Sequence, residues 1–202
     1  GQPTDGNNYL LRIGKDTINR ADYEEALEIA KTAYPYEALQ DEDTLRGIKS
    51  RLLKQLTEEL IISKHARELG LQVTESELQD TIAAIRADYP EGAFEEVLFE
   101  NAVSFTAWKK RLKMRLLMEK VIRKELLENL AITPAEVKAY YESQYQEMNG
   151  KGPTDHRNNL MIVKRLRREK ARRQYSDWID HLQQDYPVEL NANMWERILH
   201  LP

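Results

Sequence analysis

The sequence contains no cysteine, and this absence excludes several classes of site. A disulfide scaffold, a zinc site with thiolate ligands and a cysteine nucleophile all require that residue. Glycine (8 of 202 residues) and proline (7) are scarce, which excludes collagen-like and low-complexity chains. No uninterrupted apolar run approaches 18 residues, so the sequence predicts no transmembrane segment. The polar residues 1–8 do not show the basic-then-apolar pattern of a signal peptide.

Motifs that carry catalytic or ligand chemistry are also missing. The four histidines form neither an H-E-x-x-H motif nor an i,i+4 pair, and no phosphate-binding loop or G-x-S-x-G motif occurs. Two pairs of adjacent acids, Glu58-Glu59 and Glu95-Glu96, are interpreted as solvated charge, because adjacent positions on a helix do not face each other. The sequence therefore predicts no catalytic residue, no metal site and no cofactor.

What the chain does contain is apolar material for a core and an unusual amount of charge. Hydrophobic residues make up 41% of the chain and charged residues 32%, against a usual charged share of about 25%. Residues 22–100 carry 19 acids and 8 bases, whereas residues 109–124 carry eight bases and one acid, and residues 164–173 seven bases and one acid. This segregation favours acidic and basic helices that pack beside one another.

Two other interpretations of the basic runs stay open. They could recognise acidic or unfolded polypeptides, or they could form a nucleic-acid groove. Aromatic residues and glycines are not interleaved with the bases, so we expect no nucleic-acid partner.

Helix starts are the clearest local signal. Four times an apolar residue precedes a capping residue, and a second apolar residue follows four positions after the cap, as in a hydrophobic staple; the four caps are Asn19, Thr74, Ser104 and Thr133. Thr74 and Thr133 also have a glutamate three positions later, which predicts capping boxes.

Helix ends are marked by three Tyr-Pro pairs (34–35, 89–90 and 186–187) and by Gly70. The pattern predicts helices over residues 20–34, 43–69, 75–88, 94–100, 105–129, 134–147 and 165–185. Short strands are predicted at 9–13 and 17–18, with further candidates at 160–163 and 188–190 that could pair with the N-terminal strand. The predicted fold class is mainly α: an extended multi-helix module with a few short terminal β-strands.

Aromatic residues gather between residues 89 and 108, and Met114 and Met118 follow them on the next helix turns. They could form the core of a helical hairpin, or a partly open apolar cradle that contacts extended peptides, or both. The residues that we expect to contact such peptides are Tyr36, Tyr89, Phe94, Phe99, Phe105, Trp108 and Met114.

The run from Leu10 to Tyr145 resembles the N-terminal chaperone region of the SurA/PrsA group of bacterial periplasmic foldases. The segments that carry the resemblance are IGKDTINRADYEEAL, RLLKQLTEELIISKHARELGLQVTESELQDTI, FEEVLFENAVSFTAWKKRLKMRLLMEKVI and AITPAEVKAYYESQY. The stretch VKRLRREKARRQYSDWIDHLQQDYPVELN is similar to the C-terminal helix and strand that return to the N-terminal module in that family.

One departure from the family concerns the parvulin-type prolyl isomerase domain, which members usually carry between these two parts. About fourteen residues separate Tyr145 from Leu160, too few for a domain of roughly ninety. Either the chain lacks the domain naturally, or it has been lost near residues 149–152. The resemblance implies a helical chaperone region at 1–147, a linker at 148–159, and a helix and strand at 160–202 that complete the same domain.

The resemblance implies an ATP-independent periplasmic chaperone that binds unfolded outer-membrane or secreted polypeptides, is not an enzyme, and has lost its signal peptide. Two alternatives stay open. The chain could be the chaperone part of a peptidyl-prolyl isomerase whose catalytic domain is absent here, or a structural protein that forms a domain-swapped homodimer.

Overall fold

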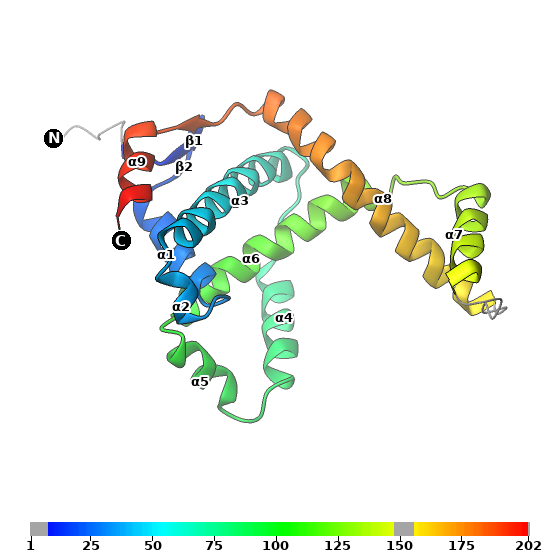
Figure 1. Ribbon diagram of the computed structural model, residues 1–202, viewed down its shortest axis with the longest axis horizontal. Helices are drawn as coiled ribbons and strands as arrows, with labels where there is room; N and C mark the ends of the chain where they lie inside the picture. Colours follow the sequence, from blue (N-terminus) through cyan, green and yellow to red (C-terminus); the bar gives the residue numbers. More distant parts are fainter. Residues whose placement is uncertain (1–7, 148–155, 202) are drawn as a thin grey trace. The chain divides into compact units, whose positions relative to one another are not determined.

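The computed structural model describes residues 8–147 and 156–201 and divides the chain into two compact units. Unit 1 contains the described residues up to Glu119 together with those from Leu182 onward, and unit 2 the described residues of Lys120–His181. The elements, shown in Figure 1, are β1 (Leu11–Ile13), β2 (Asp16–Ile18), α1 (Arg20–Lys31), α2 (Tyr36–Leu39), α3 (Glu42–Glu68), α4 (Glu75–Ala87), α5 (Ala93–Glu100), α6 (Phe105–Ile122), the π-helical segment η1 (Arg123–Leu127), α7 (Pro134–Glu147), α8 (His156–Asp185), β3 (Glu189–Leu190) and α9 (Ala192–His200).

The small sheet of unit 1 joins the two ends of the described chain. Its strand order is β2-β1-β3 and both pairings are antiparallel, with Leu11 opposite Ile18 on one side and opposite Leu190 on the other. Gly14, at φ +57°, occupies the turn between β1 and β2, where a positive φ suits a two-residue hairpin. The expected pairing of a C-terminal strand with the N-terminal strand is confirmed.

Helix α3 supplies much of the core of unit 1. Apolar residues recur on it at helical spacing, and Ile48, Leu52, Leu56 and Leu60 are all buried. Helix α1 lies against α3 (Figure 1), and the buried Tyr23 hydroxyl donates to the Lys49 carbonyl oxygen at 2.9 Å. Burial raises the pKa of this phenol because the charged form would lose its hydration.

Helix α9, which the sequence analysis missed, closes this core from the C-terminal side. The Asn191 side chain caps it by accepting from the Met194 backbone N–H at 3.1 Å, and Trp195 meets Tyr23 edge-on at 5.8 Å between ring centroids. The buried Lys49 ammonium donates to the carbonyl oxygens of Ile198 (2.9 Å) and Leu201 (2.5 Å). A cation there satisfies carbonyls that the helix itself leaves without partners.

The predicted helix starts are confirmed by hydrogen bonds at all four caps. Thr74 and Glu77 form a capping box, and the Ser104 hydroxyl oxygen accepts from the Ala107 N–H at 3.1 Å. Asn19 forms a further box with Asp22, which the sequence analysis did not anticipate. The three Tyr-Pro pairs and Gly70 (φ +67°) each follow the end of a helix, as expected.

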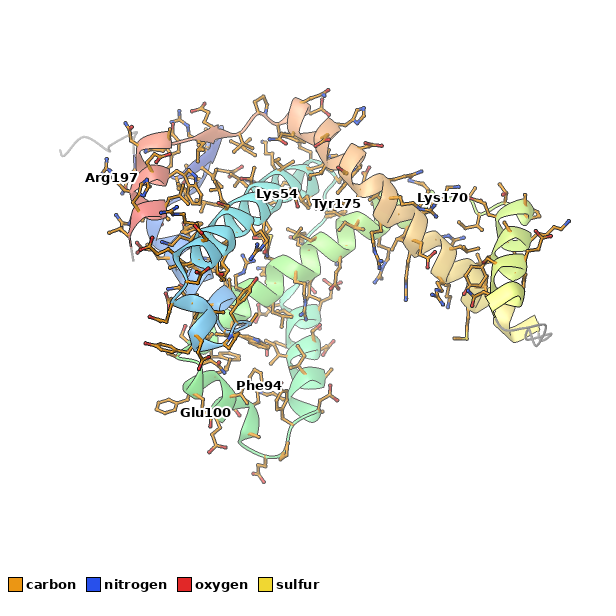
Figure 2. All side chains as sticks on the ribbon, viewed as in Figure 1. Lys54, Phe94, Glu100, Lys170, Tyr175 and Arg197 are labelled. Carbon is orange, nitrogen blue, oxygen red and sulfur yellow. The ribbon has the colours of Figure 1, made fainter. Side chains whose placement is uncertain are left out.

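In unit 2, helix α7 and the segment that precedes it are held by α8. Glu136 and Thr133 form a capping box, and Lys170 of α8 (labelled in Figure 2) donates to Glu136 at 3.0 Å and to the Ala131 carbonyl oxygen at 3.0 Å. The Arg167 Nε–H donates to the Leu130 carbonyl oxygen at 3.2 Å. These contacts use two bases of the 164–173 run as structural anchors.

The strand predicted at 160–163 is wrong, because these residues belong to helix α8. Four consecutive apolar residues fit a buried strand, but Ile162 alone among them is buried, while Leu160 and Met161 are about 70% exposed. No turn residue separates them from the helix-forming lysines and arginines that follow, so the helix continues through them.

The two units divide the chain after residues 119 and 181. The division expected from the sequence, into 1–147, 148–159 and 160–202, stays a prediction. Residues 148–155 of the expected linker lie outside the described residues, and α8 begins at His156. That the two segments form one folding domain stays a prediction. The mainly α fold class with a few short strands is confirmed.

Candidate functional site

A groove of about 490 Å³ opens on the surface of unit 1, between α1, α3, α4, α5 and α6. We call it the aromatic groove. Its lining residues are Ile29, Gln55, Glu59, Ile85, Tyr89, Phe94, Trp108, Arg111, Leu112, Arg115 and Met118.

Four rings form a continuous series at the aromatic groove: Tyr89, Phe94 and Trp108 line it, and Phe105 stacks on Trp108 beside it. The ring centroids of Tyr89 and Phe94 lie 5.6 Å apart, those of Phe94 and Trp108 4.8 Å, and those of Phe105 and Trp108 5.7 Å. The first two pairs are edge-to-face and the third is stacked, which are the arrangements that aromatic quadrupoles favour. Tyr89 and Phe105 are about 40% exposed, while Phe94, labelled in Figure 2, is 5% exposed.

The far side of these rings is part of the core. Val73, Leu78, Ile82 and Leu112 form a buried cluster, and Trp108 packs against it. The position of Trp108 is therefore fixed by close packing. The two sequence-based interpretations of the aromatic residues describe two sides of one structure: a helical core and a partly open apolar surface.

Charged side chains border the exposed rings. The Arg86 guanidinium lies 5.1 Å from the Phe105 centroid and 5.5 Å from that of Phe94, and it pairs with Glu95 at 3.0 Å. At these distances the guanidinium is attracted to the ring faces. The apolar part of the surface is thus limited on this side by an ion pair.

A partly buried ion pair also lines the aromatic groove. Arg111 of α6 donates to both carboxylate oxygens of Glu59 of α3, at 2.6 and 2.7 Å, and Gln55 donates to the same carboxylate at 3.0 Å. The Glu59 side chain is 4% exposed. The prediction that Glu59 is a solvated charge is therefore wrong, whereas Glu95 and Glu96 are exposed as expected. Adjacent helix positions lie about 100° apart, so one of two neighbours can face the core.

The expected packing of acidic against basic helices is confirmed at the start of α6. Three consecutive bases pair with acids on three different helices. Lys109 pairs with Glu75 of α4 at 2.8 Å, Lys110 with Asp22 of α1 at 3.3 Å, and Arg111 with Glu59 of α3. The Lys109 ammonium lowers the pKa of the Glu75 carboxyl by donating a hydrogen bond to it.

The structure brings four of the seven expected contact residues together and places three elsewhere. Tyr89, Phe94, Phe105 and Trp108 form the ring series. Phe99 on α5 is 86% exposed and is not among the lining residues of the aromatic groove. Tyr36 on α2 is 73% exposed and borders a separate groove of about 660 Å³ between α2, α3 and α9. Met114 is half-buried on α6, with its sulfur 3.5 Å from the Ser63 hydroxyl.

Residues 2–122 match the family of SurA-like N-terminal domains, which is more than half of the chain. The chain belongs to that family. A comparison with the curated proteins gave no match. The SurA-like domain is a chaperone-type, non-catalytic module, and it is typical of periplasmic chaperones that bind polypeptide clients.

Several groove residues of this SurA-like domain were not anticipated from sequence. Ile29, Gln55 and Glu59 come from α1 and α3, more than 25 residues from the nearest aromatic of the ring series. No local sequence pattern links these three residues to the ring series, because tertiary packing decides which helices lie side by side. Met118 is different, because its four-residue spacing from Met114 places both on one helix face. That spacing could have indicated Met118 as a lining residue.

In the described part of this SurA-like domain and of the rest of the chain, no cluster of three or more histidine, aspartate and glutamate side chains is placed to hold a metal ion. Among the same residues, no helix has both the length and the apolar character needed to cross a bilayer.

Proposed function

We propose that the chain acts as an ATP-independent periplasmic chaperone module that binds unfolded outer-membrane or secreted polypeptides in the aromatic groove. The observation that carries this proposal is the ring series of Tyr89, Phe94, Trp108 and Phe105, held rigid on one side by the core and open on the other, in a SurA-like domain.

The chemistry of the aromatic groove suits clients of varied sequence. Its apolar contacts are non-directional, so they do not require one particular side chain. Met118 adds a pliable thioether that adapts to different shapes, and Gln55 offers polar atoms to a client backbone.

The groove also suits release without a nucleotide cycle. Full burial of an exposed aromatic side chain contributes about 2 kcal/mol, and Tyr89 and Phe105 are already more than half covered. A client segment must in addition lose conformational freedom when it binds. Each contact is therefore weak, and we expect affinity to come from several client segments that bind in turn.

The test is suppression of aggregation by the chain when a urea-denatured outer-membrane β-barrel polypeptide is diluted into buffer. We expect the double variant Tyr89→Ala, Phe105→Ala to need at least threefold more protein for half-maximal protection. The matched control Tyr36→Ala, Phe99→Ala also removes one exposed tyrosine and one exposed phenylalanine, but neither belongs to the ring series. We expect it to protect as the parent chain does.

Two results would overturn the proposal. One is the absence of protection by the parent chain at a stoichiometric excess. The other is a loss of protection in the Tyr36, Phe99 control with full protection in the groove variant, which would place the client surface elsewhere. Far-UV circular dichroism of each variant shows whether the helical fold is kept.

A further inference from the structure

A further groove, of about 820 Å³, lies in unit 2 between α7 and α8. We call it the basic groove. Four of its lining residues are cations of α8 (Lys164, Arg165, Arg168 and Arg172), and among the described lining residues Glu169 is the one carboxylate.

Three cations of the basic groove differ from Arg167 and Lys170 of the same helix in what they contact. Arg167 and Lys170 are bound to the segment before α7, as described above. Arg165 pairs with Glu169 at 3.2 Å and lies 5.7 Å from the Tyr140 ring centroid. No described residue forms an ion pair with Lys164, Arg168 or Arg172. The groove therefore holds three positive charges that the described chain does not neutralise.

These three cations form a regular row. They are spaced four residues apart on α8, which corresponds to about 6 Å along the helix axis. In an extended peptide, side chains on one face recur about every 6.7 Å. Carboxylates at alternate positions of such a peptide match the row closely enough for flexible lysine and arginine side chains to reach them.

The other lining residues supply apolar contact. Met161 is 70% exposed at one end of the groove, and Tyr140 of α7 forms part of the facing wall. The residues between the acids of an alternating peptide can pack on this material. The Glu169 carboxylate, within the basic row, disfavours an occupant with an anionic group at every unit, as in a nucleic acid. The net charge of −4 for the whole chain also disfavours a polyanion.

We infer that the basic groove binds extended polypeptide segments in which aspartate or glutamate alternates with apolar residues. This site is separate from the aromatic groove and selects by charge rather than by aromatic contact. A polypeptide with both kinds of segment could then use both units.

The experiment measures binding of a fluorescein-labelled ten-residue peptide, five glutamates alternating with valines, to the full chain by fluorescence anisotropy. We expect the double variant Arg168→Glu, Arg172→Glu to bind the peptide at least tenfold more weakly. The matched control Lys124→Glu, Arg173→Glu changes the net charge equally with two exposed bases of unit 2 that do not line the groove. We expect its affinity to stay within twofold of the parent.

Each further outcome decides the proposal. An equal loss of affinity in both variants would show that the peptide responds to overall charge, and this would overturn the proposal. Binding by the Arg168, Arg172 variant as tight as that of the parent, or no binding by the parent, would also overturn it. Tighter binding of a lysine–valine peptide would contradict the charge selection. Tighter binding of a twelve-nucleotide oligothymidylate, lost in the groove variant, would make the groove a nucleic-acid site instead.

Discussion

At the scale of single residues, the pair formed by Glu59 and Arg111 places a charged carboxylate in the interior of unit 1. A carboxylate that is 4% exposed has lost most of its hydration, and the two Arg111 bonds and the Gln55 bond replace it. The pair also joins α3 to α6 beside the rings of the aromatic groove. Its role is therefore to fix the separation of two helices that form the groove walls.

Replacement of Arg111 by methionine leaves the Glu59 charge buried without its cation. We expect a loss of about 3 kcal/mol in the free energy of unfolding, measured by urea denaturation. In the double variant Glu59→Leu, Arg111→Met, most of this loss should be recovered, because no charge is left unpaired. Arg115→Met is the control: that side chain is 62% exposed, and we expect a change below about 0.5 kcal/mol. If the loss in the double variant equalled the sum of the losses in Glu59→Leu and Arg111→Met, this account would be contradicted.

The burial of the Glu59 carboxylate could not be predicted from the residues around it in the sequence. The sequence places two acids side by side, and nothing within the helix shows which one faces inward, because the deciding partner lies 52 residues away. The rings were accessible to prediction because Tyr89, Phe94, Phe105 and Trp108 are close in sequence. Their division into core and open surface depends on the packing of α4 against α6, which local pattern does not reveal.

At the scale of elements, helix starts were predictable because a cap is a local device. Thr133 and its partner Glu136 stand three positions apart, and both capping bonds form. Helix α9 was missed although Asn191 and the spacing of Met194, Trp195 and Ile198 carry the same kind of signal. The error at 160–163 has a different origin, since short apolar runs do not distinguish a strand from a helix.

The start of α7 gives a prediction about pH. Hydrogen bonds from the Thr133 backbone, from Lys170 and from the Thr133 hydroxyl lower the pKa of the Glu136 carboxyl to about 2. A carboxyl with a lowered pKa in the folded state stabilises the fold above its unfolded pKa of about 4.5, and this contribution is lost as the pH falls from about 4.5 toward 2.

The variant Glu136→Gln removes this charge but keeps an amide oxygen that can accept the capping bonds. We expect its Tm to lie below that of the parent at pH 6 and the difference to shrink as the pH is lowered to 2, followed by circular dichroism. Glu142→Gln, on the exposed side of the same helix, is the matched control. A Tm difference that stays constant from pH 6 to pH 2 would contradict the assignment.

At the scale of the whole molecule, the chain leaves unit 1 through α6, builds unit 2, and returns to unit 1 through α8. The return is held at three places. Arg12 of β1 binds Glu189 of β3 at 2.5 Å, the Asn191 N–H donates to the Leu10 carbonyl oxygen at 2.9 Å, and Lys49 holds the end of α9. The Arg12 guanidinium holds the pKa of the Glu189 carboxyl below its usual range. The two ends of the described chain thus complete one core.

Loss of the Lys49 cation should loosen this closure. In Lys49→Met the carbonyl oxygens of Ile198 and Leu201 lose a buried donor, for which we expect about 1–3 kcal/mol lower stability and faster amide hydrogen exchange in α9 and β3. Lys54→Met is the control, because Lys54 (Figure 2) lies on the exposed side of the same helix. Equal exchange rates in α9 of the two variants would show that Lys49 does not hold this helix.

The pairing of β1 with β3 also affects how each molecule folds while it is being synthesised. The two strands are separated by more than 170 residues, so during synthesis β1 has only β2 beside it until β3 has been made. In that interval one edge of β1 offers unpaired N–H and C=O groups, and the apolar face that α9 covers is open. A newly made molecule of this chain is itself an incompletely folded polypeptide with exposed apolar surface, the same kind of species that its finished form is proposed to bind.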